Sequence, residues 1–228
     1  MTDMRINADF TRRCVMRSQD MDWTASPMAG VERKMLERIG GEHTKRATSI
    51  VRYAPGSHFS EHTHTGGEEF LVLEGVFSDE TGDYPAGTYI RNPIGTKHAP
   101  HSDKGCTIFV KLQHFETSDQ AQINMDTRAL DFAPGISEGL SVLPLHQTPR
   151  EHAALVHWRP GTYHSRHAHR GGEEILVLDG VLSDEYGNYE KGTWLRNPHM
   201  SSHRPYSEQG CLIYVKTGHL MPDYLAGL

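Results

Sequence analysis

One stretch of this chain occurs twice. Residues 52–115 align without gaps on residues 157–220 at a constant offset of 105 positions, and about half of the paired residues are identical. A repeat of this length is too long for a solenoid unit and matches a complete small domain. It predicts two tandem domains, which we assign to residues 1–120 and 121–228. Residues 1–20 have no counterpart in the repeat and are interpreted only as an extension.

Within each copy, short apolar segments alternate with turn residues. In the first copy, β-branched and aromatic residues gather in segments that Pro-Gly, Gly-Gly and Glu-Thr-Gly-Asp sequences separate. The segments are 48–53, 70–73, 88–91 and 107–111, and the more diverged stretches 23–39 and 132–145 are interpreted as opening strands. No long window has a 3.6-residue period. The pattern predicts an all-β fold, with an antiparallel sandwich or barrel in each half.

The charge, the cysteine content and the lack of long apolar segments indicate which partners and which cellular compartment to expect. Acidic residues outnumber basic ones by 29 to 23, and the net charge of -6 argues against a nucleic-acid surface. The N-terminal residues lack the apolar core of a signal peptide, and no apolar run is long enough to span a bilayer. Cys14, Cys106 and Cys211 are too few and too far apart for a disulfide framework. We therefore expect a soluble cytoplasmic protein with no nucleic-acid or membrane partner.

Both copies carry the same spacing of histidine and glutamate. The spacing is His-x-His, a glutamate four residues later, and a third histidine about thirty residues further on. The residues are His62, His64, Glu68 and His98 in the first copy, and His167, His169, Glu173 and His203 in the second. Alternate strand residues share a face, so each His-x-His pair can point into a barrel. The intervening Gly-Gly pair permits a bend that returns the glutamate to the interior.

These residue types predict one divalent metal in each half. Three imidazoles and a carboxylate suit zinc, iron, manganese or nickel, and unrelated surface histidines have no reason to keep their spacing across two copies. Ligand type alone does not select the metal. The second copy departs from the first at Met200, which replaces Gly95 and could alter the turn that delivers His203.

The residues beside these ligands have other interpretations. Glu69 and Glu174 follow the ligand glutamates, and adjacent strand residues point to opposite faces. They therefore face outward, or else orient a ligating imidazole from behind. Cys106 and Cys211 each follow a glycine at the start of an apolar strand and are expected to be buried, unreactive thiols.

The spacing of ligands, glycines and prolines resembles the two signatures of the cupin superfamily. In the first copy these are Gly56, His62, His64, Glu68 and Gly75, then Gly87, Pro93, Gly95 and His98. The resemblance implies two tandem cupin barrels of the double-stranded β-helix or jelly-roll type. The run Gly-Gly-Glu-Glu-x-Leu-Val-Leu-x-Gly-Val-x-Ser-Asp-Glu-x-Gly, with the later Arg-Asn-Pro and Gly-Cys-x-Ile, resembles the ChrR-type cupin in particular.

The ChrR resemblance implies a regulatory function. That cupin is the zinc-binding sensor half of an anti-sigma factor family that responds to singlet oxygen and organic peroxides. The sigma factor is bound by a separate helical domain with a His-x3-Cys-x2-Cys motif, which this sequence lacks, and this argues against direct sigma-factor binding. The resemblance therefore implies a metal-binding bicupin, with zinc as the first expectation for its metal, that acts as an oxidative-stress sensor module in transcription regulation.

An enzyme is the alternative. Bicupins include oxygenases and decarboxylases, and a metal with an open position could polarise a small organic substrate or activate oxygen. Glu69 or His101 could then assist proton transfer. In a third interpretation one copy is active and the other is structural. A small-molecule ligand and a homodimer paired through exposed barrel edges are the partners we expect.

Overall fold

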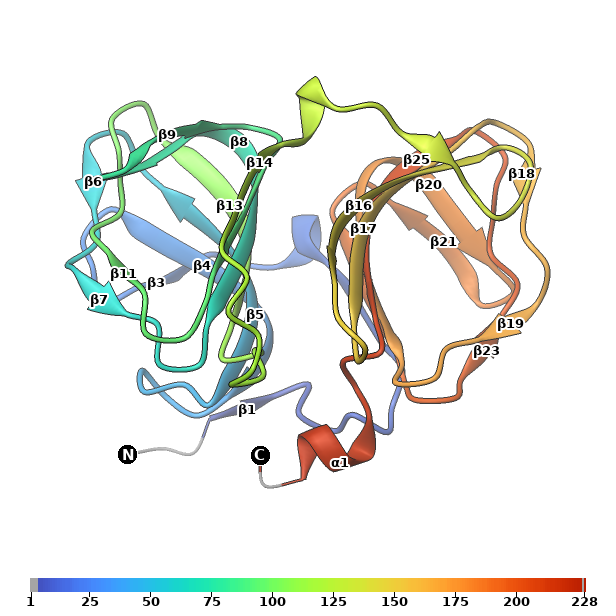
Figure 1. Ribbon diagram of the computed structural model, residues 1–228, viewed down its shortest axis with the longest axis horizontal. Helices are drawn as coiled ribbons and strands as arrows, with labels where there is room; N and C mark the ends of the chain where they lie inside the picture. Colours follow the sequence, from blue (N-terminus) through green and yellow to red (C-terminus); the bar gives the residue numbers. More distant parts are fainter. Residues whose placement is uncertain (1–3, 227) are drawn as a thin grey trace. The chain divides into compact units, whose positions relative to one another are not determined.

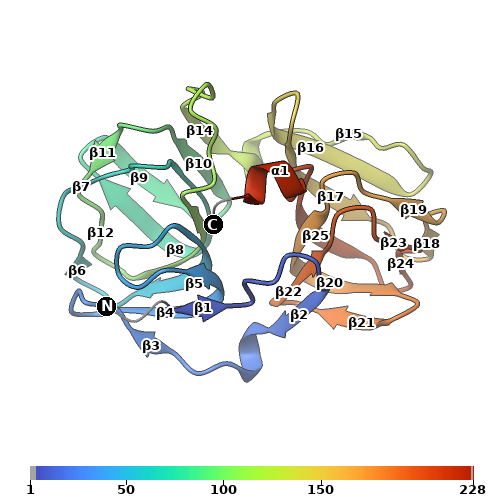
Figure 2. The same ribbon diagram turned by 90° about the horizontal axis from the view of Figure 1, so that it is seen from below.

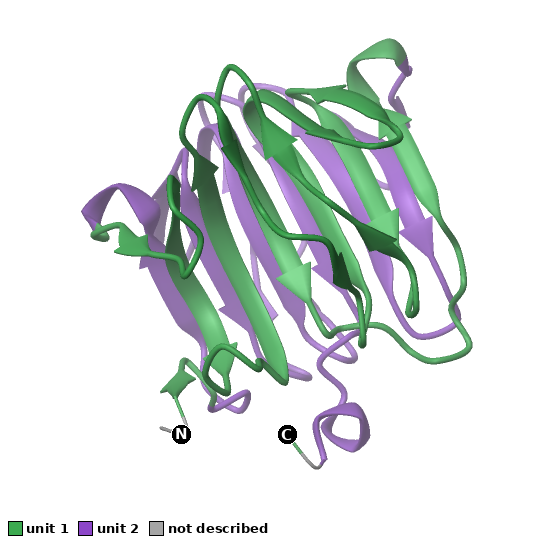
Figure 3. Ribbon diagram, turned by 90° about the vertical axis from the view of Figure 1, so that its left-hand side faces the viewer, with its two compact units in different colours: residues 1–8, 21–129, 228 green, residues 9–20, 130–227 purple. Residues whose placement is uncertain are grey.

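The computed structural model describes residues 4–226 and 228, which form two compact units (Figure 3). Of these residues, unit 1 contains 4–8, 21–129 and 228, and unit 2 contains 9–20 and 130–226. Apart from two 3-10 turns, Ser18–Asp20 and Thr127–Ala129, and the short helix α1 (Pro222–Leu225), the regular structure of the described residues is β-strand. The all-β prediction is confirmed.

Unit 1 is built from antiparallel strands that wrap around one interior (Figure 1). Its main sheet runs in the order β1-β4-β5-β13-β8-β10-β14, and β7 pairs with β11 in a separate ribbon. The strands are β1 (Arg5–Ile6), β3 (Thr24–Ala25), β4 (Val31–Ile39), β5 (Arg46–Tyr53), β6 (Ser57–His58), β7 (His62–Thr63), β8 (Glu68–Asp79), β9 (Gly82–Pro85), β10 (Thr88–Asn92), β11 (Lys97–His98), β12 (His101–Ser102), β13 (Cys106–Leu112) and β14 (Ile123–Asp126).

Unit 2 repeats this arrangement. Its main sheet runs in the order β15-β16-β17-β25-β20-β22-β2, and β19 pairs with β23 (Figure 2). The strands are β2 (Cys14–Arg17), β15 (Ala133–Pro134), β16 (Leu140–Gln147), β17 (His152–Trp158), β18 (Thr162–Tyr163), β19 (His167–Ala168), β20 (Glu173–Asp184), β21 (Gly187–Glu190), β22 (Thr193–Asn197), β23 (Ser202–His203), β24 (Tyr206–Ser207) and β25 (Cys211–Thr217). The strands predicted from the apolar segments of the first copy lie within β5, β8, β10 and β13 of unit 1.

The longest strand of each unit bends at a glycine and so serves two sheets. The first part of β8 pairs with β13 and β10, and the part after Gly75 pairs with β9 and β12. Gly75 has a φ of 72°, and a Cβ there would lie 2.0 Å from the carbonyl oxygen of Gly105. Only glycine fits this close approach. Gly180 makes the same bend in β20, 2.1 Å from the carbonyl oxygen of Gly210.

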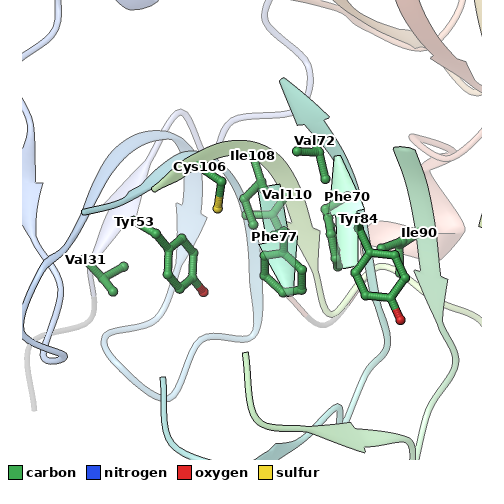
Figure 4. Close-up of a cluster of buried hydrophobic side chains, with 10 residues drawn as sticks. All are labelled: Val31, Tyr53, Phe70, Val72, Phe77, Tyr84, Ile90, Cys106, Ile108 and Val110. Atoms are coloured by element: carbon green, nitrogen blue, oxygen red, sulfur yellow. The ribbon is translucent and has the colours of Figure 1, made fainter. Parts of the chain in front are cut away.

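The bend closes each sheet over an apolar core. In unit 1 the rings of Tyr53, Phe77 and Tyr84 lie side by side, with centroids 5.8 Å and 6.3 Å apart, among aliphatic residues of β8 and β13 (Figure 4). Trp158 and Tyr189 are the large aromatic members of the matching cluster in unit 2. Burial of these side chains is the main source of stability for a small barrel.

The residues interpreted as an N-terminal extension include two strands, β1 in unit 1 and β2 in unit 2. β2 pairs with β22 at one edge of the unit 2 sheet, and Cys14 lies opposite Arg196. β14 pairs in the same way with β10 of unit 1. Both β2 and β14 are followed by a 3-10 turn. No helix in the part of the chain that the structure describes is long and apolar enough to cross a membrane.

Candidate metal centres

The four predicted ligands of the first copy come together in unit 1. His62 lies on β7 and His98 ends β11, and the pairing of these strands sets the two residues opposite one another. His64 follows β7 directly, and Glu68 begins β8. The imidazole centroids are 4.7–5.2 Å apart. Each of the four residues offers one ligand atom within 4.8 Å of the others, which is close enough to share an ion.

Hydrogen bonds fix the orientation of the three imidazoles. The Nδ1 atoms of His62, His64 and His98 contact the carbonyl oxygen of Ser60 at 2.9 Å, Thr96 Oγ1 at 2.9 Å and Asp79 Oδ2 at 3.2 Å. The Thr96 hydroxyl donates to the carbonyl oxygen of Pro93, so it accepts from the imidazole. Each ring therefore carries its proton on Nδ1, which leaves the Nε2 lone pair free to bind a metal.

Two imidazole nitrogens of this group are buried and, in the part of the chain that the structure describes, have no hydrogen-bond partner, which is the state expected of atoms that bind a cation. The Nε2 atoms of His64 and His98 are buried and unpartnered among the described residues, and they lie 3.3 Å and 3.5 Å from Glu68 Oε2. Asn92 donates to the same carboxylate at 3.1 Å and holds it in place. Burial lowers the pKa of His64, which favours the neutral, ligating ring. These residues fit a divalent metal, because buried polar atoms otherwise need partners.

The second copy assembles a similar group in unit 2, with a difference. His167, His169 and His203 offer atoms within 4.8 Å of one another, but Glu173 does not join this group. Its carboxylate nevertheless lies 3.2 Å from His169 Nε2 and 3.5 Å from His203 Nε2. Both of these nitrogens are buried and lack a partner in the described chain, as in unit 1.

Unit 2 keeps the turn that Gly95 makes in unit 1, although Met200 must adopt a strained left-handed backbone conformation to do so. Met200 adopts a φ of 61°, in the left-handed region where Gly95 has a φ of 90°. The backbone hydrogen bond that follows is longer in unit 2: the amide of His169 donates to Ser201 at 3.4 Å, whereas His64 donates to Thr96 at 2.9 Å. The His169 side chain is also more exposed, at 18% against 2% for His64. The second centre is therefore looser than the first.

Two aspartates that the sequence analysis did not single out support the third histidines. Asp79 contacts Nδ1 of His98 at 3.2 Å, and Asp184 contacts Nδ1 of His203 at 3.5 Å. Burial opposes ionisation of Asp79, but hydrogen bonds from His98 and neighbouring groups outweigh it and lower the pKa of Asp79. The sequence signal was the Ser-Asp-Glu run, which both copies contain.

Glu69 and Glu174 point away from the candidate metal sites, as one of their two interpretations predicted, but they are not exposed. Both are buried, on the face of the strand opposite the ligand glutamates. Glu69 accepts a hydrogen bond from Tyr89 at 2.9 Å and lies 3.6 Å from Arg91 Nε, while Glu174 lies 3.4 Å from His219 Nε2. The interpretation that they face outward from the barrel interior is therefore confirmed, and Tyr89, Arg91 and His219, which they contact, are not among the predicted ligands. The opposite face of each sheet is buried too, which strand periodicity alone could not reveal.

The cysteines of the two apolar strands are buried and unpaired with each other. Burial raises the pKa of Cys106 and of Cys211 to about 11, so both thiols are protonated near neutral pH. A protonated, buried thiol is a poor nucleophile. The structure therefore agrees with the expectation that they are unreactive.

The candidate metal site of unit 1 opens onto an interior cavity of about 260 Å³. His62, His64, Glu68 and His98 form one part of its wall. Apolar side chains form much of the rest, including Val31, Tyr53, Phe59, Phe77, Ile108 and Val110. His101, which we considered as a proton donor, does not line it. The ligands are thus accessible to a small molecule inside the barrel.

An antiparallel barrel that turns three histidines and a glutamate toward its interior is a cupin, so the chain is a bicupin with a candidate metal site in each unit. It belongs to the family of ChrR cupin-like domains, which matches residues 11–116 and again residues 120–221. No curated protein matches the chain.

Several solved structures share the bicupin fold at low identity. A provisionally assigned dioxygenase from Nostoc punctiforme is 14% identical, with a TM-score of 0.78 over 93% of this chain and 86% of its own. A provisionally assigned glyoxylate-induced protein from Pseudomonas aeruginosa is 13% identical, with a TM-score of 0.72 over 96% and 92%. A deletion mutant of Bacillus subtilis oxalate decarboxylase is 14% identical, with a TM-score of 0.59 over 90% and 76%. At these identities the likeness shows the fold.

Proposed function

We propose that this bicupin is a metal-dependent enzyme that transforms a small organic molecule inside unit 1, with dioxygenase or related chemistry. The observation that carries the proposal is the cavity of about 260 Å³ beside His62, His64, Glu68 and His98. A structural metal site is closed by its protein ligands, whereas a catalytic site keeps a position open to substrate. Here the ligands form part of a wall and leave room on the other side.

The residues around the cavity have the properties that such chemistry needs. Asp79 and Thr96 hold the imidazoles of His98 and His64, so the ligand set is preorganised. Phe59 and Phe77 line the cavity and would exclude water from a bound substrate. A bound divalent metal would act as a Lewis acid and, if redox-active, could activate oxygen.

The comparisons support an enzyme without naming its substrate. Two of the structures that share the fold are described as a dioxygenase, provisionally, and an oxalate decarboxylase. Both descriptions name an enzyme, and the second names a small substrate, oxalate. They therefore favour the enzymatic alternative over the sensor that the ChrR resemblance implies.

The family match supports a second candidate, a zinc-binding regulatory module of the ChrR type. Zinc has no redox chemistry, so a zinc centre would not activate oxygen. Metal identity and turnover therefore separate the two candidates.

The test is metal analysis combined with activity. The protein is purified without added metal, its metals are quantified by mass spectrometry, and samples reloaded with iron, manganese, nickel or zinc are assayed for oxygen uptake and product formation. The substrates are small ketones, aldehydes, phenols and carboxylic acids. We expect iron, manganese or nickel in the purified protein and turnover with at least one of them, because the ligand set suits all three.

Variants locate the reaction. His98→Ala should remove about one equivalent of metal and abolish turnover, while His203→Ala should remove about one equivalent and leave turnover in place. His58→Ala, which changes an exposed histidine, is the matched control and should retain both metals. Two equivalents of zinc and no turnover with any reloaded metal would overturn the enzyme proposal in favour of the regulatory one.

A further inference from the structure

A β-bulge places two arginines on the interior face of unit 1. The register of β4 against β5 shifts by one residue between Met35 and Glu37. Arg33 and Arg38 are five residues apart, and in a regular strand they would lie on opposite faces. The extra residue of the bulge reverses the alternation, so both side chains face the same way. Both line the cavity that the metal ligands line.

The two arginines bring more positive charge than the surrounding residues neutralise. Arg33 donates two hydrogen bonds to the Glu42 carboxylate, from Nη1 at 3.2 Å and from Nη2 at 2.5 Å, and its buried Nε has no partner among the described residues. Arg38 donates to the carbonyl oxygens of Gly40 and Gly41. Burial and the charge of Arg33 lower the pKa of Arg38, a sign of a poorly compensated cation. Two guanidinium groups thus share one carboxylate.

The position of Arg38 relative to the metal centre follows from strand register. Arg38 lies opposite Ala47, Ala47 lies opposite Leu112, and Leu112 lies opposite Glu68. The arginine and the ligand glutamate therefore lie on one cross-strand row, three strands apart. Three spacings amount to about 14 Å along the curved sheet and to less across the interior. A ligand of modest length could contact both ends.

Unit 2 provides a natural comparison because its barrel lacks this pair. Val142 lies opposite Val156 and Gln147 lies opposite His152, the positions that Arg33 and Arg38 hold in unit 1. The sheet of unit 2 has a bulge at the matching place, between Pro144 and His146. The barrel therefore forms without arginines at these positions, which argues that they serve a purpose other than folding.

We propose that the cavity of unit 1 binds a small organic carboxylate, with its carboxylate held by Arg33 and Arg38 and its other end at the metal centre. A single uncompensated positive charge matches a monoanion, and the Nε of Arg33 and the Arg38 N–H groups not bonded to Gly40 or Gly41 can donate charge-assisted hydrogen bonds to its carboxylate. The apolar side chains between the two ends suit a hydrocarbon middle. This inference deepens the proposed function and names the substrate class.

The test uses binding, so that it does not depend on turnover. The protein is loaded with zinc, and hexanoate and 3-phenylpropanoate are titrated by calorimetry beside their neutral amides. We expect both acids to bind at one site per chain and at least about tenfold more tightly than the amides, since the charged hydrogen bonds contribute at least about 1.4 kcal/mol. Amides that bind as tightly as the acids, or acids that do not bind, would overturn the proposal.

Variants that copy the residues of unit 2 provide the control. Arg33→Val and Arg38→Gln introduce the residues that unit 2 has at these positions, so both are compatible with the barrel. Each should reduce the preference for acids over amides at least about fivefold, whereas Arg159→Gln, which removes an exposed arginine of unit 2, should not. An unchanged preference in both interior variants would overturn the proposal. Binding that follows this pattern without turnover on any metal would leave it standing while the enzyme proposal fails.

Discussion

The candidate metal sites of units 1 and 2 have the same four residue types but different surroundings. In unit 1 the Thr96 hydroxyl orients His64, and the four predicted ligand atoms lie within 4.8 Å of one another. In unit 2 the His169 amide donates to the Ser201 carbonyl oxygen at 3.4 Å, whereas the His64 amide donates to Thr96 at 2.9 Å, and Glu173 does not join the group of three histidines. Duplication therefore preserved the ligands while the residues that hold them diverged. Ligand identity alone does not make two sites equivalent.

The residues beside the first histidine of each candidate site also differ between the units, in their polarity. Phe59 lies against His62 in unit 1, with ring centroids 5.3 Å apart. The equivalent residue in unit 2 is His164, whose ring lies 4.7 Å from that of His167. Unit 1 thus has an apolar wall beside its ligands, and unit 2 has a polar one. This difference favours unit 1 as the place where an organic molecule binds.

The feature that both units share, the bend of the long strand, should give the largest effects. Gly75→Ala and Gly180→Ala should each lower the free energy of unfolding by about 3 kcal/mol, because each combines a positive φ with a Cβ that meets a carbonyl oxygen. Urea denaturation of the metal-free protein measures the loss. Gly56 has a φ of 74°, and a Cβ there would meet nothing within 4 Å. Gly56→Ala should therefore lower the free energy of unfolding by only about 1 kcal/mol. A loss of stability in only one of the two variants would contradict the inference that the two bends are energetically equivalent.

Substitution of the aspartates that contact the third histidines should lower the metal affinity of the two sites by different amounts. Asp79→Asn should lower the metal affinity of unit 1 by about 10–100-fold, because the carboxylate orients His98 and increases its basicity. Asp184→Asn should have a smaller effect, since Asp184 lies farther from its histidine, at 3.5 Å, and also pairs with Arg13 at 2.8 Å. Chelator competition measures each affinity in protein whose other site is disabled by His203→Ala or His98→Ala. Equal losses in the two units would contradict the difference inferred from these contacts.

The smallest effect concerns the turn before the third histidine. Met200→Gly should stabilise unit 2 by about 1 kcal/mol, because it removes the cost of a left-handed backbone at a side chain that is 59% exposed and packs little. Gly95→Met should destabilise unit 1 by a similar amount, through φ alone, since a Cβ there meets nothing within 4 Å. Calorimetric unfolding measures both. Destabilisation by Met200→Gly would mean that the side chain contributes packing that outweighs the strain.

Much of the fold, and the grouping of the candidate metal ligands, could be predicted from the sequence, for identifiable reasons. Strand alternation and paired glycines are local properties, so the strands and the direction of His62 and His64 follow from residues close together in the chain. The repeat added a second, independent copy of the pattern. The assignment of a metal to the eight residues remains a prediction, which metal quantification and the histidine variants test.

Other features depended on contacts between distant residues. Asp79 reaches His98 only because β8 bends at Gly75, and Glu69 is buried because the face opposite Glu68 is also covered. Neither fact has a local signature. The interior position of Arg38 depends on a bulge whose location a strand pattern does not reveal.

The amino-acid sequence by itself determined which chemical groups each half can offer a metal, because those groups recur at one spacing in two copies. Only the tertiary structure decided which groups share a cavity, which imidazoles are held firmly and which face of a strand carries Arg38. The physical reason is that spacing along a chain sets the direction of a side chain locally, whereas strand register and bulges set which distant side chains meet.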